Sequence, residues 1–339
     1  MSSLTYVNTV EQRARALDEA RRIRLLKAEE IDTAKYLKAN DVTHKVHEAE
    51  MWLDEMRDEL GQAAKRDEGF PMPWSKTQNS FKFRPGEVTL YAGSNGGGKS
   101  LITGQIALGL VKYKQPICIA SFEMKPKRTL YRMLRQFAGE NIDFPKFMDK
   151  AKYIGGLLDR FRMFADGRLF LYDQQGTTNS QQVIAMARFC AVELGIKHIF
   201  IDSLMKCVAG EDDYNAQKFF VDEMTAVARD HGVHIHLIHH IRKLQSEEIQ
   251  PNKNDIKGTG AIADQVDNVL LMWRNKKKEH KAQSGVAVDD KDPDAMLMCE
   301  KQRNGEAEDW FSLWYDKESQ QFVEMPGAVP ISFDDKGRF

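Results

Sequence analysis

The segment that most constrains the fold runs from residue 87 to residue 112, where an apolar stretch, a glycine-rich octapeptide and a second apolar stretch follow one another. The octapeptide GSNGGGKS, Gly93 to Ser100, matches the pattern G-x-x-x-x-G-K-[ST] at every fixed position. Its three central glycines let the backbone turn its N–H groups inward, and the dipole of the following helix points at the same place. The pattern predicts a strand–turn–helix unit that holds the phosphates of a nucleotide.

Two side chains of the octapeptide have distinct predicted tasks. Lys99 reaches the β- and γ-phosphates, and the hydroxyl of Ser100 is a ligand of Mg²⁺. The alternative, a glycine-rich turn without a ligand, is disfavoured by the Lys-Ser pair in register. We therefore expect ATP or another nucleoside triphosphate, together with Mg²⁺. The residues expected to contact the nucleotide are Gly93, Ser94, Asn95, Gly96, Gly97, Gly98, Lys99, Ser100 and Leu101.

Apolar runs alternate with helical patterns from residue 81 to residue 325, which predicts an α/β domain with a mainly parallel sheet covered on both faces. The predicted strands are 87–92, 117–122, 168–172, 197–202, 233–239, 268–273, 295–300 and 309–315. The predicted helices are 99–112, 126–138, 180–194 and 214–230. Aromatic residues and turn signals in the last two strands indicate an antiparallel hairpin.

The two ends of the chain differ from this domain. Residues 1–66, with almost no Gly or Pro, predict two or three amphipathic helices with little core of their own. We expect a helical N-terminal arm there, for oligomerisation or for docking of another protein. Residues 67–80 contain Gly69, Pro71 and Pro73 and indicate a linker, and 326–339 form a C-terminal tail without an assigned role.

Composition narrows the class of protein. Apolar residues at 42% and charged residues at 29% are typical of a soluble globular chain, and no apolar run approaches the roughly 20 residues of a membrane span. The four widely spaced cysteines and the absence of a signal-like start favour the reducing cytoplasm. The formal net charge of −1 means that any binding of nucleic acid depends on a local patch.

Two carboxylates end predicted strands. In KHIFIDS, Asp202 follows four apolar residues, where a P-loop protein needs its second metal carboxylate. Ser203 rather than Glu comes next, so water activation by an Asp-Glu pair is disfavoured. In PICIASFEM, Glu123 ends the strand 117–122. If that strand lies beside strand 87–92, Glu123 reaches the same crevice and orients an attacking water. The plain alternatives are ordinary strand-end acids.

Two basic or imidazole-rich stretches follow later in the chain. The strand ending CEKQRNG presents Lys301 and Arg303 on one side, and an Arg at a γ-phosphate stabilises transition-state charge. A surface pair is the alternative. In HGVHIHLIHH, His234 and His236 share a strand face but lack a Cys or carboxylate partner at ligand spacing, which disfavours a metal site. A switch role for His240, coupling the γ-phosphate to the next loop, is favoured instead.

That loop, residues 242–261, is too long for a passive connection and ends in a Gly-Thr-Gly turn whose amides can bind phosphate. A solvated charged loop is the alternative, since three acidic residues dilute its positive charge. The segment 208–217 is a candidate for a second loop of this kind, although its acidity disfavours direct contact with phosphate.

From about residue 75 to 325 the chain resembles the ATPase domain of the replicative ring helicases. The resemblance rests on six stretches in this order: GEVTLYAGSNGGGKS, SFEM, HIFIDS, HLIHHIRK, DIKGTGAIADQVDNVLLMWRN and EKQRNG. These comprise the bacterial DnaB type and the phage primase-helicase type, with a RecA-like core. The resemblance implies a RecA-like P-loop NTPase fold, preceded here by the helical N-terminal region. It also implies a hexamer that hydrolyses nucleoside triphosphate at subunit interfaces and pulls single-stranded DNA through its channel.

The resemblance also assigns roles by position. Glu123 falls on the catalytic glutamate, Asp202 on the metal-site aspartate, and His240 on the polar residue that senses the γ-phosphate. Lys301 and Arg303 fall on the basic pair that reaches the neighbouring subunit's site. The loop after His240 falls on the segment that holds the DNA backbone. Its residues expected to contact DNA are Arg242, Lys243, Lys253, Lys257, Gly258 and Gly260.

We therefore predict an ATP-dependent, ring-forming replicative DNA helicase that translocates on single-stranded DNA. The alternatives are a RecA-like recombination or clock-type remodelling ATPase, and a non-processive ATP-binding loader. The chain departs from the family in two ways: no zinc-binding or primase-like segment precedes the ATPase, and residues 1–66 are short for the bacterial amino-terminal domain. Expected partners are single-stranded DNA, further copies of the chain, and a primase or another replication protein. Such reduced forms suggest a phage-encoded protein.

Overall fold

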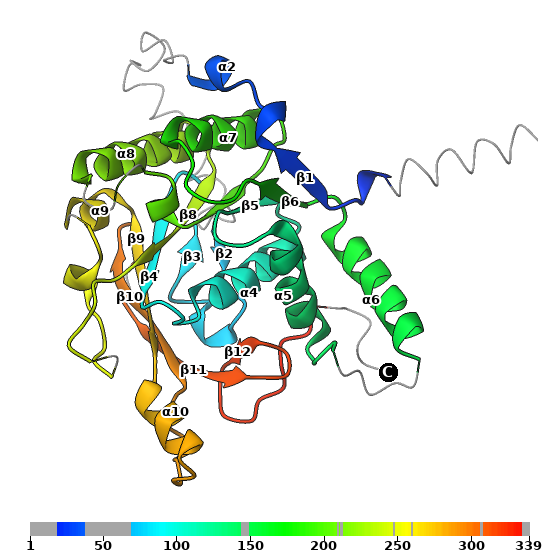
Figure 1. The fold of residues 1–339 in the computed structure, drawn as a ribbon, viewed down its shortest axis with the longest axis vertical. Helices are drawn as coiled ribbons and strands as arrows, with labels where there is room; N and C mark the ends of the chain where they lie inside the picture. The colour runs from blue at the N-terminus through cyan, green and yellow to red at the C-terminus, as the bar shows by residue number, and fades with distance from the viewer. Residues whose placement is uncertain are drawn as a thin grey trace, which may run out of the picture.

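The computed structural model of the chain describes residues 19–37, 69–143, 149–208, 210, 213–246, 248–258, 260–305 and 308–333. Within these residues one large sheet has the order β1-β6-β5-β7-β8-β4-β9-β10-β11-β12 (Figure 1). Its strands are β1 (Arg24–Lys27), β4 (Val88–Gly93), β5 (Ile117–Ser121), β6 (Leu169–Asp173), β7 (His198–Asp202), β8 (His234–His240), β9 (Asn268–Arg274), β10 (Ala295–Gln302), β11 (Trp310–Asp316) and β12 (Gln321–Val323).

The pairs from β1 to β9 are parallel, and β10, β11 and β12 extend the sheet in antiparallel fashion. The helices are α2 (Thr33–Leu37), α4 (Lys99–Lys112), α5 (Pro126–Ala138), α6 (Lys150–Ala165), α7 (Ser180–Val192), α8 (Tyr214–His231), α9 (Gly260–Gln265) and α10 (Lys276–Gln283). A small separate sheet pairs β2 (Phe70–Pro71) with β3 (Lys82–Phe83). The mainly parallel α/β fold predicted from the sequence is therefore confirmed.

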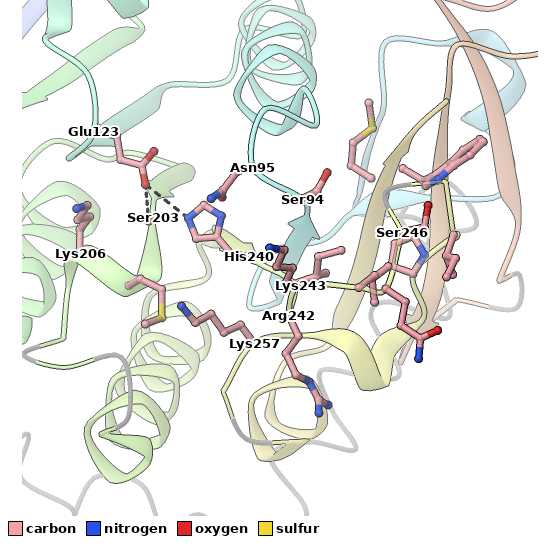
Figure 2. A pocket seen from close by; sticks show the side chains of 18 residues that line it. Ser94, Asn95, Glu123, Ser203, Lys206, His240, Arg242, Lys243, Ser246 and Lys257 are labelled. Carbon is pink, nitrogen blue, oxygen red and sulfur yellow. Dashed lines mark hydrogen bonds and ion pairs between the residues drawn. The ribbon is translucent and has the colours of Figure 1, made fainter. Parts of the chain in front are cut away.

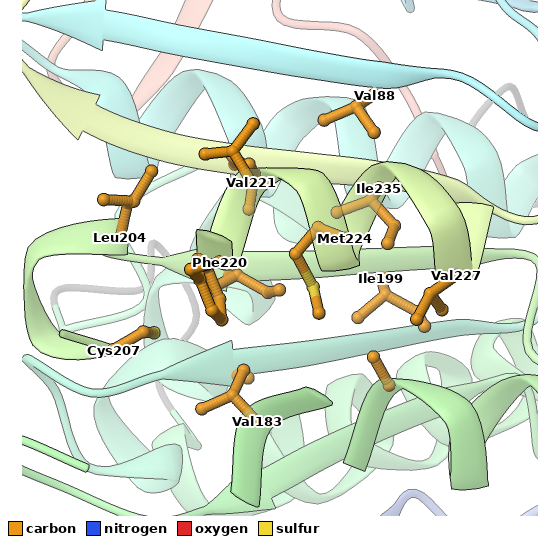
Figure 3. Close-up of a cluster of buried hydrophobic side chains, with 14 of the residues drawn as sticks. Val88, Val183, Ile199, Leu204, Cys207, Phe220, Val221, Met224, Val227 and Ile235 are labelled. Atoms are coloured by element: carbon orange, nitrogen blue, oxygen red, sulfur yellow. The ribbon is translucent and has the colours of Figure 1, made fainter. Parts of the chain in front are cut away.

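Two hydrophobic clusters cover the two faces of the sheet. Because side chains alternate along a strand, Val88 and Leu90 of β4 face one cluster with α7 and α8, whereas Tyr91 faces the other with α4, α5 and α6. Figure 3 shows the first cluster, in which Val221 and Met224 of α8 lie against the strands. Burial on both faces explains why the central strands read as continuous apolar runs.

All eight predicted strands and all four predicted helices are present, with each end within two residues of its predicted position. Helix α6 was missed, because Gly155 and Gly156 lie in its interior and glycine lowers helical propensity. The helix forms nevertheless, since Leu157 and Phe161 are buried against the second cluster.

Two of the predicted boundaries are wrong. Residues Arg24–Lys27 are not helical but form β1, which extends the sheet beyond β6; the rest of the predicted arm, 1–18 and 38–66, lies outside the described residues. The expected linker 67–80 is packed into the domain from residue 69 onward, with Met72 and Trp74 fully buried. The indole of Trp74 donates a hydrogen bond to the carbonyl of Phe322 at 2.8 Å, so the prolines bend a core segment rather than separate two domains.

The remaining expectations have mixed outcomes. All four cysteines are buried and free, as predicted. In the tail, Phe333 is buried against the domain, and 334–339 lie outside the described residues. Among the described residues, no helix is both long enough and apolar enough to cross a membrane.

Candidate nucleotide-binding site

The octapeptide forms the turn between β4 and α4, and its glycines are required by its shape. Gly96 and Gly98 adopt left-handed backbone conformations with φ of 69° and 93°. A Cβ on Gly97 would lie 2.9 Å from the carbonyl oxygen of Ser94. Lys99 begins α4, and its ammonium donates to the carbonyls of Gly93 at 2.9 Å and Ser94 at 2.8 Å. The predicted strand–turn–helix unit is therefore present, with its lysine folded over the loop.

Asp202, at the end of β7, lies next to the start of α4. The hydroxyl of Ser100 donates to Oδ2 of Asp202 at 2.7 Å, so two oxygen atoms converge at one point beside the loop. Burial raises the pKa of the Asp202 carboxyl, against the effect of the Ser100 hydrogen bond. A buried carboxylate and a hydroxyl are the hard oxygen ligands that Mg²⁺ prefers, and a cation there would offset the cost of burying the charge. These residues fit a magnesium ion.

Glu123 reaches the same crevice by a route that the sequence did not reveal. Strand β5 does not lie beside β4, because β7 and β8 stand between them. Glu123 Oε1 nevertheless accepts a hydrogen bond from Ser203 at 3.0 Å and lies 3.6 Å from Nε2 of His240 (Figure 2). His240 lowers the pKa of the Glu123 carboxyl most strongly, to about 2, with a smaller contribution from Ser203. Glu123 is therefore ionised at neutral pH.

His240 lies between the two charged groups of the site. Its Nδ1 is 3.3 Å from the ammonium of Lys99, and its Nε2 faces Glu123. On the backbone side, the carbonyl of His240 accepts a hydrogen bond from the amide of Lys257 at 2.9 Å. The imidazole thus connects the phosphate loop to Glu123, and its main chain connects both to the loop 242–258.

A cleft of about 780 Å³ joins these groups to that loop. Ser94, Asn95 and Glu123 line one part of it, and Arg242, Lys243 and Lys257 line another (Figure 2). Lys206, in the short 3-10 helix after β7, also lines the cleft, although no motif in the sequence indicated it. Its only signal is a position four residues after Asp202. The cleft carries several cations beside one carboxylate, which suits a passage for anionic groups.

A second cleft of about 390 Å³ lies on the other side of the turn. Gly96, Gly98 and Leu101 line it together with Arg274, Tyr315 and Phe322. The guanidinium of Arg274 donates to the carbonyl of Gly96 at 3.1 Å, so the end of β9 is tied to the phosphate loop. Glu279 also lines this cleft and pairs with Arg274, and the aromatic rings beside the phosphate site are suited to a nucleobase. Sequence reasoning missed these residues, because they come from β9, α10, β11 and β12.

The predicted basic pair lies elsewhere in the protomer. Lys301 donates to the carbonyls of Ala263, Asp264 and Val266, and Arg303 pairs with Asp267 at 3.2 Å. Asp267 bonds to Val88, at the end of β4 opposite the phosphate loop. Along β4, Val88 and Gly93 are five residue steps apart, and at about 3.3 Å a step this is a distance of about 16 Å. The two side chains share a side, as predicted, but they do not reach the phosphate loop of their own subunit.

The loop after β8 is folded back on that strand. An isolated bridge pairs Ile241 with Ile256, and Nε2 of His239 is 2.6 Å from the carbonyl oxygen of Lys257. Gly258 has φ of 99°, and a Cβ there would lie 2.4 Å from the side chain of Gln217. Lys253 lies in a short 3-10 helix and Gly260 begins α9; Thr259 and Glu247 lie outside the described residues. Both ends of the loop are therefore attached to the nucleotide site.

Of the other histidines of the HGVHIHLIHH stretch, His234, His236 and His239 belong to the core, whereas His231 ends α8. His234 bonds to Thr89 at 2.8 Å and to the carbonyl of Arg84 at 2.7 Å, and His236 bonds to Tyr91 at 2.9 Å. These hydrogen bonds give both buried rings polar partners, so a metal ion is not needed to explain why the rings are buried. In the acidic segment 208–217, Asp213 caps α8, whereas 209, 211 and 212 lie outside the described residues.

A mainly parallel sheet with a phosphate loop on one strand, and carboxylates at the ends of two others, defines a RecA-like P-loop NTPase. Comparison with known proteins is more specific. The profile of the DnaB-like helicase C-terminal domain matches residues 78–324, and the chain belongs to this family. It is therefore an ATP-hydrolysing replicative DNA helicase, and the recombination, clock-type and loader alternatives are not favoured.

Two solved structures share the fold. One, an ATPase domain, superposes with a TM-score of 0.69 at 17% identity, covering 83% of this chain and 99% of that one. A DnaB-like replicative helicase, described with its interactions with primase, gives 0.65 at 16% identity, covering 82% of this chain and 67% of that one. At these identities the two structures support the fold alone.

Proposed function

We propose that this chain is the motor subunit of a ring, with six copies as the expected number, that hydrolyses ATP between subunits while it moves along single-stranded DNA. The observation that carries this proposal is the position of His240. Its imidazole lies between Lys99 and Glu123, and its carbonyl accepts a hydrogen bond from Lys257. A change at the γ-phosphate is thereby passed directly to the loop proposed to hold DNA.

Nucleotide binding uses the residues from Gly93 to Leu101. Their amides surround the phosphates, Lys99 neutralises the β- and γ-phosphates, and the base enters the cleft of Arg274 and Tyr315. Ser100 and Asp202 would hold Mg²⁺, which when bound neutralises charge on the phosphates. Lys99 is suited to this task because its ammonium already lies at the mouth of the loop.

Hydrolysis requires a water in line with the γ-phosphorus. Glu123 accepts a hydrogen bond from that water, whose oxygen bonds to phosphorus as the bond to the β-phosphate oxygen breaks. The water's proton leaves with the products, ADP and inorganic phosphate. Because the pKa of Glu123 is held near 2, the group acts as a fixed acceptor that orients the water. Arg303 of the adjacent subunit stabilises the charge that develops on the phosphoryl oxygens, and Lys301 holds the strand end that carries it.

DNA binding is proposed for Arg242, Lys243, Lys253 and Lys257, with the amides of Gly258 and Gly260. These groups recognise backbone phosphates, so binding is expected to be insensitive to sequence and to weaken steeply with salt. Residues 1–66 are proposed to contact neighbouring subunits or to dock a primase or another replication protein. The cytoplasm is the proposed place of action, in a host cell if the protein is phage-encoded.

The central experiment substitutes Glu123→Gln, which keeps the shape of the side chain and removes its charge. ATP binding should persist, ATP hydrolysis should fall by about 10²-fold or more, and unwinding of a forked duplex should stop. Glu318→Gln, at an exposed position between β11 and β12, is the matched control and should behave as wild type. Near-normal turnover by Glu123→Gln would remove the proposed role of this carboxylate.

Action across the interface has its own test. Subunits with Arg303→Ala and subunits with Lys99→Ala are each expected to be inactive alone. In a mixed ring, the intact nucleotide site of one receives the intact guanidinium of the other, so part of the activity should return. Mass measurement with ATP and single-stranded DNA must show rings in the mixture. Rings without any recovery would refute action in trans.

A further inference from the structure

Asp267 lies between α9 and β9, within the stretch DIKGTGAIADQVDNVLLMWRN but with no role assigned to it so far, and its carboxylate is almost fully buried, with 4% of the side chain exposed. Oδ2 accepts a hydrogen bond from the amide of Val88 at 2.9 Å. Oδ1 faces two guanidinium groups, that of Arg303 at 3.2 Å and that of Arg229 at 3.6 Å. A buried carboxylate with these neighbours has a fixed position, because moving it would leave the charge without partners.

Arg303 is held to this carboxylate at several points. Its amide donates to the carbonyl of Asp267 at 3.0 Å, Nη1 contacts the carboxylate, and Nη2 lies 3.4 Å from the carbonyl of Asp264. The side chain is still 42% exposed, and a guanidinium has five N–H donors in a rigid plane. One edge is therefore fixed from inside, while donors remain for an acceptor outside the subunit.

The second cation of the pair is arranged differently. The ammonium of Lys301 donates to three carbonyls at the carboxyl end of α9, at 2.8 to 3.0 Å, which uses all three of its donors. It therefore ties β10 to α9. Helix α9 follows directly on the loop 242–258. The residues that hold Arg303 are therefore attached to the segment proposed to hold DNA.

We propose that Asp267 is a positioning residue that orients Arg303 toward the nucleotide of the neighbouring subunit. This inference rests on the proposed action of Arg303 in trans. A long arginine side chain without such an anchor samples many rotamers, and a displacement of about 1 Å can cost about 10²-fold in rate. Asp267 removes this freedom before the neighbour binds ATP. Arg229, on α8, contacts the same oxygen from a greater distance, 3.6 Å against 3.2 Å, so its removal should affect the orientation of Arg303 much less than removal of the carboxylate charge.

The test uses Asp267→Asn in the full chain, because asparagine keeps an acceptor for the amide of Val88 and loses the charge that orients Arg303. The rate of ATP hydrolysis in assembled rings should fall by about 10-fold to 10²-fold, with KM for ATP within about twofold of wild type. Arg229→Gln is the matched control, since it removes the other cation of Asp267, and should keep the wild-type rate. A wild-type rate for Asp267→Asn, or a faster one, would overturn the proposal.

A double-mutant cycle separates positioning from general damage. If Asp267 acts through Arg303, then Asp267→Asn combined with Arg303→Ala should be no slower than Arg303→Ala alone. A further large loss in the double variant would mean that Asp267 acts by another route. If Arg303→Ala itself hydrolyses ATP normally, the proposed trans role fails instead, and the two failures are distinguished.

Mixed rings provide a gain of activity that a misfolded subunit cannot show. Asp267→Asn subunits mixed with an excess of Lys99→Ala subunits should recover turnover, because the neighbour then supplies a correctly held Arg303. No recovery, with unchanged thermal midpoints, would refute the inference. If Asp267→Asn does not form rings, Asp267→Glu provides the same measurement, since it keeps the charge and displaces it by one methylene. Its rate should fall in the wild-type background and be unaffected in the Arg303→Ala background.

Discussion

Acidification from pH 7 to pH 5.5 is expected to destabilise this domain through four buried histidines. His234 and His239 have pKa values lowered to about 4, and burial is the main cause in both. Burial is also the main reason why the pKa values of His198 and His236 lie well below the usual value, and neighbouring imidazoles add to the effect. All four rings are therefore neutral in the folded protein at pH 5.5, whereas the same residues in the unfolded chain titrate near pH 6.5.

The packing of these rings explains why a proton is not accommodated. His236 stacks on Phe200 with 3.9 Å between ring centroids and 6° between planes, and its Nε2 lies 3.2 Å from Nδ1 of His198. No carboxylate is among the groups that shift the pKa of His198, His234 or His236. Protonation would place a charge in the apolar second cluster without a counter-ion, which is costly.

The direction and the size of this stability change follow from the linkage between proton binding and folding. Between pH 7 and pH 5.5 the unfolded chain takes up protons at these positions and the folded protein does not, so stability falls as the pH falls. Each histidine contributes RT ln[(1 + 10^(6.5−5.5))/(1 + 10^(6.5−7))], or about 1 kcal/mol. The four together contribute about 4 to 5 kcal/mol, a large part of the typical 5 to 15 kcal/mol of a domain.

The assay is urea unfolding of the full chain at the two pH values, followed by tryptophan fluorescence. His234→Gln removes one titrating ring, so its loss of unfolding free energy between the two pH values should be about 1 kcal/mol smaller than that of wild type. His280→Gln, at an exposed position on α10, is the matched control and should keep the wild-type difference. Equal stability of the wild-type protein at both pH values would refute the reasoning, as would an unchanged difference in His234→Gln.

Further predictions concern the nucleotide and DNA sites and the core. Arg274→Ala should raise KM for ATP about 10-fold with little change in kcat, because the base cleft binds substrate and transition state alike; an unchanged KM in steady-state kinetics would argue against that cleft. Asp202→Asn should raise the Mg²⁺ concentration needed for half-maximal hydrolysis by about 10-fold, and a Mg²⁺ titration identical to wild type would exclude this ligand. Trp74→Phe loses the buried hydrogen bond to Phe322 and should lower the unfolding free energy by about 1 to 3 kcal/mol in urea. Lys243→Ala should weaken binding of single-stranded DNA of any sequence and reduce the slope of log K against log salt by about 1, which fluorescence anisotropy at several salt concentrations can test.

Local patterns predicted most of the elements because they are set by short-range physics. The turn at 93–100 needs glycines and a following helix, and buried parallel strands need continuous apolar runs, so both are legible along the chain. The ends of the predicted elements were accurate for the same reason. The N-terminal segment failed because β1 is a four-residue edge strand whose formation depends on pairing with β6, which nothing in its own sequence indicates.

The residues of the site also divide into those that local sequence patterns predicted and those that only the tertiary structure revealed. Lys99, Ser100 and Asp202 were predicted from their motifs, since each follows directly from a strand or a turn, and the structure places all three beside the phosphate loop. Glu123 was predicted both from the resemblance and from an assumed pairing of its strand with the phosphate-loop strand; that pairing is wrong, because β5 and β4 are not neighbours and Glu123 is connected to the loop through His240. Lys206 lies in no motif, and Arg274 and Asp267 lie in a stretch that carried the family resemblance but gave them no role. Each acquires its place only when strands distant in the chain are brought side by side.

The chain alone was sufficient to predict the phosphate loop, the strands and the helices, since these depend on residues within one or two turns of each other. Tertiary structure decided the strand order, the two clefts and the contacts that hold Arg303. The physical reason is that contacts between residues far apart in sequence depend on how the faces of the sheet are covered, and many chain orders satisfy the same local pattern. Asp267 is an example. In the sequence it looks like an ordinary acidic residue of a loop, and only the packing of β4, β9 and β10 brings Val88 and Arg303 into contact with it.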